Sequence, residues 1–202
     1  MRITEIKVNG VRRPLGFAMP CVNVSFKVGE THSKKAENIR ISLSKAGEED
    51  ILAHWEGTDL APGGTVLCDA GVLTPRTAYT VRVSVTGDAG DSAESETGFE
   101  TGKMDEPWSA QWIAAVKGDS CHPVLKKTVT VGPGLVQARL YAAGVGMFEA
   151  YVNGEKLGEE YLKPGVTNYE TRVQVITFPV ETLKEGKNEL SFLLGKGWGR
   201  ST

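Results

Sequence analysis

Hydrophobic and polar residues alternate along most of this chain, and the alternating segments are short. In residues 79–86 (YTVRVSVT) the larger apolar side chains fall at every second position, which places them on one face of an extended strand. Turn residues separate such segments from one another. The pattern predicts strands at residues 4–8, 22–28, 39–44, 65–68, 79–86, 98–102, 138–143, 148–154, 171–178 and 189–194.

Two segments raise the question of a helix. The apolar residues of 36–46 also recur at helical spacing, but Ile39, Ile41 and Leu43 alternate with polar residues. Because β-branched residues in that register favour a half-buried strand, we predict a strand there. A single helical turn is predicted in residues 180–188, where Gly186 closes a short run of apolar and polar residues.

Glycine and proline mark the turns and one larger boundary. The chain has 24 glycines in 202 residues, above the roughly 7% of average proteins, which suits a chain that turns often. Residues 102–107 end a strand and pass through a charged stretch to Pro107, before apolar Trp108 restarts the pattern. The sequence therefore predicts an all-β chain of two β-sandwich domains, residues 1–103 and 104–202.

The first predicted domain carries the pattern of a tyrosine corner. Leu73 and Pro75 precede Tyr79, which begins a strand. In such a corner the phenol bonds to nearby backbone, and the arrangement is typical of immunoglobulin-like and fibronectin type III sandwiches. Val81 stands where an immunoglobulin disulfide would need a cysteine, so the fibronectin type without that bridge fits better. Fold alone gives no activity, and such a module is usually a spacer or a packing partner.

The second predicted domain contains two turn signals. Asn153 and Gly154 both tolerate positive φ, as a type I′ hairpin turn requires, and Pro164 with Gly165 marks a second turn. The simplest interpretation of both signals is structural.

Charge and cysteine content exclude several classes of partner. The chain has 23 basic and 25 acidic residues without a clustered run of one sign, so neither nucleic acid nor an anionic membrane is expected as a partner.

The N-terminus lacks the apolar run of a signal peptide, which predicts a cytoplasmic location, or secretion if an export signal has been removed. Cys21, Cys68 and Cys121 are odd in number and far apart, and we interpret them as reduced apolar side chains.

The acidic and histidine residues do not form a recognisable catalytic or metal-binding pattern. Adjacent Glu159 and Glu160 would point to opposite faces of a strand, and no calcium-loop spacing is present. The other carboxylates considered, which lie on turn-rich surface, are Glu149, Glu155 and Glu170. His32, His54 and His122 lack partners at ligand or triad spacing. We expect no catalytic residue, no metal and no cofactor in this chain.

Sugar binding is the sharper hypothesis for the second domain. A pyranose stacks its C–H faces on exposed aromatic rings and directs its hydroxyls to a few polar groups. The candidates are Tyr151, Tyr169 and Trp198, with Asn153 or Asn168 as hydroxyl partners. Core packing remains the alternative explanation for each of them. Two further aromatics near the boundary, Trp108 and Trp112, are interpreted as packing between the domains.

Seven motifs in a fixed order add a family resemblance. They are PLG at 14–16, LTPRTAYTVRV, FETG, WSAQWIAA at 108–115, ARLYAAGVGMFEAYVNGEKLG, LKPGVTNY and LKEGKNELSFLLGKGW. Together they resemble the N-terminal region of bacterial α-L-rhamnosidases over nearly the whole chain. The resemblance implies a fibronectin-like module followed by a jelly-roll-like sandwich that helps to recognise substrate. It also implies that the catalytic acids lie in an (α/α)₆ barrel further along the parent protein.

The resemblance implies that this chain is a non-catalytic fragment. Its second sandwich would be incomplete at the C-terminus, and the parent would release terminal rhamnose from glycosides or polysaccharides. Uncovered sheet edges in a truncated sandwich predict self-association. Two alternatives remain open from the residues: a tandem immunoglobulin-like adhesive or scaffolding protein, and an autonomous carbohydrate-binding module.

Overall fold

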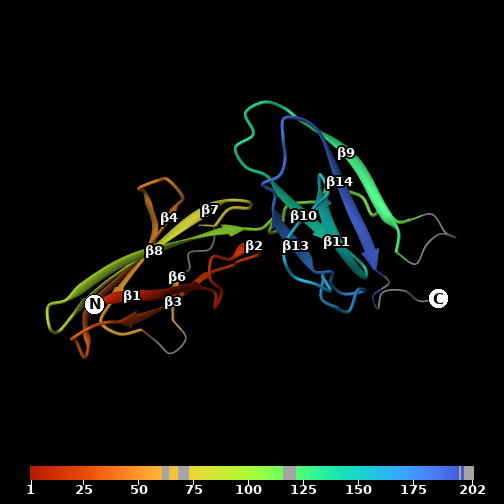
Figure 1. The fold of residues 1–202 in the computed structure, drawn as a ribbon. Coiled ribbons are helices and arrows are strands. Elements are labelled where there is room, and N and C mark those ends of the chain that lie inside the picture. Colours follow the sequence, from red (N-terminus) through yellow and green to blue (C-terminus); the bar gives the residue numbers. More distant parts are fainter. Residues whose placement is uncertain (61–63, 68–72, 116–121, 196, 198–202) are drawn as a thin grey trace. The chain divides into compact units, whose positions relative to one another are not determined.

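The computed structural model describes residues 1–60, 64–67, 73–115, 122–195 and 197 (Figure 1). Within these ranges the regular structure is strand only, as the alternation predicts. The chain divides into two compact units, Met1–Pro107 and Trp108–Thr202. No described helix is long and apolar enough to cross a membrane, because none of the described residues is helical.

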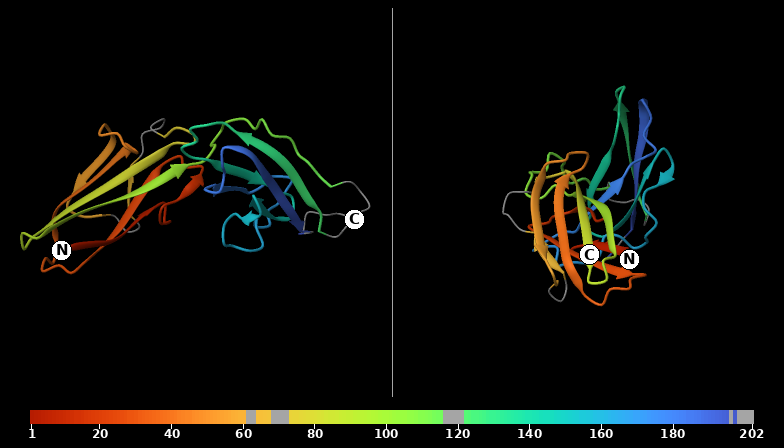
Figure 2. Two further views of the ribbon diagram at one scale, coloured as in Figure 1. Left: turned by 45° about the horizontal axis from the view of Figure 1, so that its top comes forward. Right: turned by 90° about the vertical axis from the view of Figure 1, so that its left-hand side faces the viewer.

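The first unit is a sandwich of two sheets that lie face to face (Figure 2). The smaller sheet has the order β1-β3-β6, formed by β1 (Arg2–Val8), β3 (Val22–Gly29) and β6 (Thr65–Leu67). The larger sheet has the order β2-β8-β7-β4-β5. Its strands are β2 (Leu15–Phe17), β4 (Ala36–Lys45), β5 (Ile51–Gly57), β7 (Ala78–Gly87) and β8 (Ser92–Thr101).

Alternation along β7 and β4 builds the core between these sheets. Every second residue of β7 from Tyr79 to Val85 is buried. Ile41 and Leu43 on β4 are buried beside Val83 and Val81 of β7, to which they pair. The strand predicted at residues 39–44 is therefore confirmed over the helical alternative. Burial of branched apolar side chains at each second position is what specifies this register.

The tyrosine corner is present. The backbone N–H of Thr74 donates a hydrogen bond to the Tyr79 hydroxyl at 2.8 Å, and the Tyr79 side chain is fully buried. Its ring stacks on Phe99 of the neighbouring strand with 5.3 Å between ring centroids. The phenol thus ties the 73–78 turn to the strand that follows it.

A parallel strand pair joins the start of the first unit to its end. β2 runs parallel to β8, with Leu15 opposite Glu100. The N–H groups of Glu100 and Gly102 each donate at 2.9 Å to the carbonyls of Pro14 and Phe17. A Cβ atom on Gly102 would collide with the carbonyl oxygen of Gly16, so this close approach requires glycine at position 102.

The expectation of reduced cysteines is wrong for Cys21, which is disulfide-bonded. Separation along the sequence says little about distance across a sandwich, because strand pairing brings remote residues together. Cys68 and Cys121 lie outside the described residues.

The second unit places a four-stranded sheet against a two-stranded one. The larger sheet has the order β12-β11-β14-β9, and the smaller one pairs β10 with β13. The strands are β9 (Val124–Val131), β10 (Arg139–Ala143), β11 (Met147–Val152), β12 (Glu155–Lys156), β13 (Val175–Pro179) and β14 (Gly186–Gly195). Their shared core contains Ala142, Ile176 and Phe178 from the smaller sheet, and Phe148, Ala150 and Val152 from β11. Trp108 and Trp112 are both exposed, and their role in packing between the domains stays a prediction.

The helical turn predicted in residues 180–188 is absent. The Asn188 side chain accepts a hydrogen bond from Lys184 N and donates to the carbonyls of Lys184 and Gly186. These bonds hold a loop that leads directly into β14, whose first residue, Gly186, has φ of 90°. The buried side chain of Asn188 therefore bonds the backbone groups of this loop, which in a helix would bond one another.

Candidate functional site

The candidate site lies on the outer face of the four-stranded sheet of the second unit. On β11, Phe148, Ala150 and Val152 face the core, so Glu149 and Tyr151 face outward. The short turn after β11 brings Lys156 opposite Tyr151. Strand alternation and one hairpin thus bring a carboxylate, a phenol and an ammonium group together on one surface.

Four side chains form what we call the tyrosine cluster: Glu149, Tyr151, Lys156 and Tyr161. The Tyr151 hydroxyl donates to Glu149 Oε2 at 2.5 Å. Lys156 Nζ pairs with Glu149 Oε1 at 2.5 Å and lies 4.1 Å from the centroid of the Tyr161 ring. The Tyr161 side chain is 76% exposed, so it offers an aromatic surface to solvent.

Mutual contacts fix the charge states of this cluster. The Lys156 ammonium, and then the Tyr151 hydroxyl, hold the pKa of Glu149 below the ordinary value of a glutamate. The same carboxylate raises the pKa of Lys156 and that of Tyr151. At neutral pH the cluster therefore contains a carboxylate, an ammonium ion and a neutral phenol. A general acid for glycoside cleavage needs a carboxyl group that stays protonated, and Glu149 is held in the opposite state.

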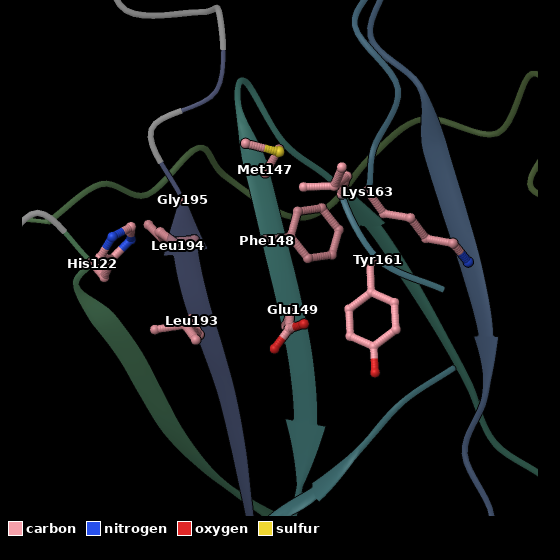
Figure 3. Close-up of a pocket in the computed structure, with 10 residues that line it drawn as sticks. His122, Met147, Phe148, Glu149, Tyr161, Lys163, Leu193, Leu194 and Gly195 are labelled. Carbon is pink, nitrogen blue, oxygen red and sulfur yellow. The ribbon is translucent and has the colours of Figure 1, made fainter. Parts of the chain in front are cut away.

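An open groove of about 190 Å³ lies beside the cluster (Figure 3). Its surface is mainly apolar, and Glu149 is the single acidic side chain among its described lining residues. The groove is lined by His122, Met147, Phe148, Glu149, Tyr161, Leu162, Lys163, Leu193, Leu194 and Gly195. Among the described residues, no group of three or more His, Cys, Asp or Glu side chains is placed to hold a metal ion.

The sequence-predicted sugar-binding residues that the structure describes have different roles. Tyr151 belongs to the tyrosine cluster. Asn153, at φ of 52°, donates through Nδ2 to Thr182 O and Asn188 Oδ1, and accepts from Glu189 N. Its amide is therefore used inside the unit.

The remaining candidates are not members of the tyrosine cluster. Asn168 accepts a hydrogen bond from Glu170 N at 3.1 Å within a turn, and Tyr169 beside it is half-buried. Trp198 lies outside the described residues. Three members of the tyrosine cluster, Glu149, Lys156 and Tyr161, were not among the predicted sugar-binding residues. The i, i+2 spacing of Glu149 and Tyr151 on a strand was a usable signal, whereas nothing in the sequence indicates that Tyr161 folds back over Lys156.

Two family models match the chain. The model of the Rha78A-like N-terminal immunoglobulin domain matches residues 3–105, just over half of the chain. The model of the α-L-rhamnosidase N-terminal domain matches residues 134–202.

Individual relatives agree with these matches. An α-L-rhamnosidase of Alteromonas sp. is 26% identical over an alignment of 220 positions, which covers 96% of this chain and 24% of the relative. The solved α-L-rhamnosidase of Dictyoglumus thermophilum has a TM-score of 0.81 at 24% identity, covering 97% of this chain and 25% of that one. The enzyme of Aspergillus terreus has a TM-score of 0.78 at 24% identity, covering 98% and 24%.

The two solved structures agree with this chain in fold, and the chain spans about a quarter of the length of each of these three relatives. The chain therefore belongs to the family of Rha78A-like N-terminal immunoglobulin domains and has the two-unit architecture found at the N-terminus of α-L-rhamnosidases.

Proposed function

We propose that this chain is the non-catalytic N-terminal part of an α-L-rhamnosidase that releases terminal rhamnose from glycosides or polysaccharides. The observation that carries the proposal is the fold match over 97% of the chain to one quarter of a rhamnosidase. The chemistry of Glu149 supports it, because a general acid must stay protonated, whereas the contacts with Lys156 and Tyr151 lower the pKa of this carboxyl group. The adhesive or scaffolding alternative gains no support from relatives that are named α-L-rhamnosidases.

A chromogenic α-L-rhamnoside tests this assignment. We expect no turnover by the purified 202-residue chain above a mock-purified control, and turnover by the full-length protein encoded by the continued reading frame. Turnover by the chain alone would contradict its non-catalytic role. A full-length protein inactive on α-L-rhamnosides would contradict the proposed parent activity.

We also propose that the tyrosine cluster contributes to substrate recognition. Tyr161 offers an exposed ring for the C–H face of a sugar, and the polar atoms of Glu149 and Lys156 lie beside it for hydroxyl groups. NMR titration of the chain with L-rhamnose checks this. We expect L-rhamnose to cause chemical-shift changes that reach saturation. These changes should be lost in Tyr161→Ala and kept in the matched variant Tyr169→Ala. Shifts that persist in Tyr161→Ala would show that the cluster is not the site.

The isolated chain is proposed to self-associate through the smaller sheet of the second unit. Among the described strands, β10 and β13 pair only with each other, so no described strand pairs with the second edge of either. Unpaired edges favour pairing with a second chain. Sedimentation velocity over a concentration series should show a rising average mass. A mass that stays monomeric at the highest concentration would contradict this proposal.

We propose, finally, that the protein works in an oxidising compartment, the second of the two locations considered from the sequence. The disulfide at Cys21 supports this, since disulfides are rare in reducing cytosol. Mass spectrometry of the native protein after thiol blocking checks it. A blocked, reduced Cys21 would contradict the proposal.

A further inference from the structure

One end of the second unit gathers exposed apolar side chains. Residue pairing defines this end: Met147 lies opposite Gly195, Val124 opposite Leu193, and Ala143 opposite Val175. β9 and β11 therefore begin here, β14 ends here, and β10 ends beside the start of β13. We call it the open end. Leu162 lies here too, since it lines the same groove as Met147 and Gly195, and so does Val166, since Gly165 N is bonded to the side chain of Gln174, next to Val175. Exposed apolar side chains at this end are Val124, Val145, Leu162, Val166 and Val175.

Leu162 is unfavourable in two separate ways in the isolated chain. Its side chain is 77% exposed, although burial of a leucine is favourable. Its φ of 57° lies in the left-handed region, which is strained for a bulky residue other than glycine. Backbone strain of this kind concentrates at functional and binding surfaces. A partner that covers Leu162 would bury the side chain that this strained backbone presents.

The apolar groove opens at the same end. Met147 and Leu193 line it (Figure 3), and Leu162 also belongs to its lining. The open end therefore continues from exposed loops into a concave apolar surface. A contiguous apolar surface of this kind marks an interaction site more often than scattered single residues do.

The backbone leaves β14 close to this apolar surface. Gly195 ends β14 at the open end, and the backbone of Gly197 lies against that of Gly146 in the turn between β10 and β11. The polypeptide therefore leaves β14 at the open end itself. A segment tethered there meets this surface at a high effective concentration, which a free partner lacks.

We propose that the open end is the docking surface for the polypeptide that follows residue 202 in the parent protein. This inference rests on the proposed function, under which the chain is about a quarter of a longer enzyme. The docked segment presents apolar side chains to Leu162, Val166 and the groove. The tyrosine cluster stays at the margin of the contact, on the outer face of the sheet.

Hydrogen exchange in the full-length protein tests the proposal. The exchange rates of residues 161–166 are compared between the full-length protein and the 202-residue chain. We expect them to be at least about tenfold slower in the full-length protein. Residues 134–137, at the opposite end of the unit, should exchange equally in both. Equal rates at 161–166 would overturn the proposal. So would protection of residues 161–166 in the isolated chain that grows with its concentration, because a second copy would then cover the open end itself.

Leu162→Gly separates docking from a structural role. Glycine tolerates the left-handed backbone, so the isolated chain should keep or raise its melting temperature. The full-length variant should nevertheless lose the protection of residues 161–166. The same substitution at the opposite end, Leu135→Gly, should leave that protection unchanged. A lower melting temperature of the isolated Leu162→Gly chain, with protection retained in the full-length variant, would show that Leu162 serves the fold of the unit and would overturn the proposal.

The activity assay tests the proposed function, and hydrogen exchange tests the docking surface. A protected open end in a full-length protein without α-L-rhamnosidase activity would contradict the proposed function alone. An active enzyme with an unprotected open end would contradict the docking surface alone.

Discussion

Tyr79 shows how much a single hydroxyl contributes to the first unit. In Tyr79→Phe the ring keeps its place against Phe99, but Thr74 N loses the 2.8 Å hydrogen bond to the hydroxyl. This hydrogen bond is part-buried, so its loss should cost about 0.5–1.5 kcal/mol. Urea denaturation should show this loss for Tyr79→Phe and almost none for Tyr161→Phe, whose side chain is exposed. Equal stability of Tyr79→Phe and wild type would mean that the corner is dispensable.

Asp91 makes the first unit sensitive to acid. Its carboxylate accepts hydrogen bonds from the hydroxyls of Ser33 and Thr31 and from His32 N, and lies 3.4 Å from the N-terminal ammonium group. The Ser33 hydroxyl, followed by that of Thr31, holds the pKa of Asp91 well below its ordinary value.

A group whose pKa is lowered by folding stabilises the protein above its unfolded-state pKa, and this contribution is lost as the pH falls toward the folded-state value. The stability due to Asp91 should therefore be intact at neutral pH and decline below about pH 4. Denaturation midpoints of wild type and Asp91→Asn, measured across acidic pH, should converge as the pH falls. A difference in denaturation midpoint that stays constant across acidic pH would show that the Asp91 carboxylate is not the source of the acid sensitivity.

Residue roles were partly predictable from the sequence. The spacing of Leu73, Pro75 and Tyr79 predicted the corner, because that geometry depends on local sequence. The bonds from Asn153 to Asn188 and Thr182 were not predictable, since they join residues about 30 positions apart whose proximity depends on how the strands pair. The same holds for Tyr161 over Lys156.

The hairpin from β11 to β12 depends on its two turn residues. Asn153 and Gly154 have φ values of 52° and 83°, as the sequence signal required. Asn153→Ala removes both the tolerance of positive φ and the side-chain bonds, so we expect a loss of about 1–3 kcal/mol. Asn153→Gly keeps the turn and should lose less. Thermal denaturation compares them, and alanine and glycine variants of equal stability would contradict a backbone requirement here.

Strand prediction succeeded where one face of the strand is buried and failed where it is not. β4, β7 and β11 have clear alternation because a core selects it. β9 was missed, since its residues 126–128, Lys-Lys-Thr, are exposed and interrupt the pattern. β5 lies at the edge of its sheet and buries none of its residues fully. β13 begins only at Val175, because Thr171 and Arg172 donate their N–H groups to Asn168 O in a turn.

At the scale of the whole molecule, the two units differ in how well their cores are enclosed. The first core is surrounded by a three-stranded and a five-stranded sheet, and branched side chains such as Val22, Val24 and Ile41 are fully buried. In the second unit the two-stranded sheet leaves Leu190, Phe192 and Leu194 only partly buried. Burial of apolar area is the main source of stability, so the second unit should be weaker.

Calorimetry should therefore show two unfolding transitions, with the second unit melting first. Residues 1–107 expressed alone should reproduce the higher transition, and residues 108–202 alone should give the lower one or remain unfolded. A single transition for the chain that neither piece reproduces would show that the units are interdependent.

The parallel pairing of β2 with β8 has a mechanical consequence. β8 is the last strand before the chain continues toward the second unit, and it is fastened to β2 by hydrogen bonds from Glu100 and Gly102. When the chain is pulled from its two ends, force on neighbouring parallel strands acts along the sheet, so these hydrogen bonds are sheared together instead of being opened one at a time. We expect the first unit to resist mechanical unfolding more than its thermal stability alone would suggest. The hydrogen bonds between β2 and β8 should provide this resistance.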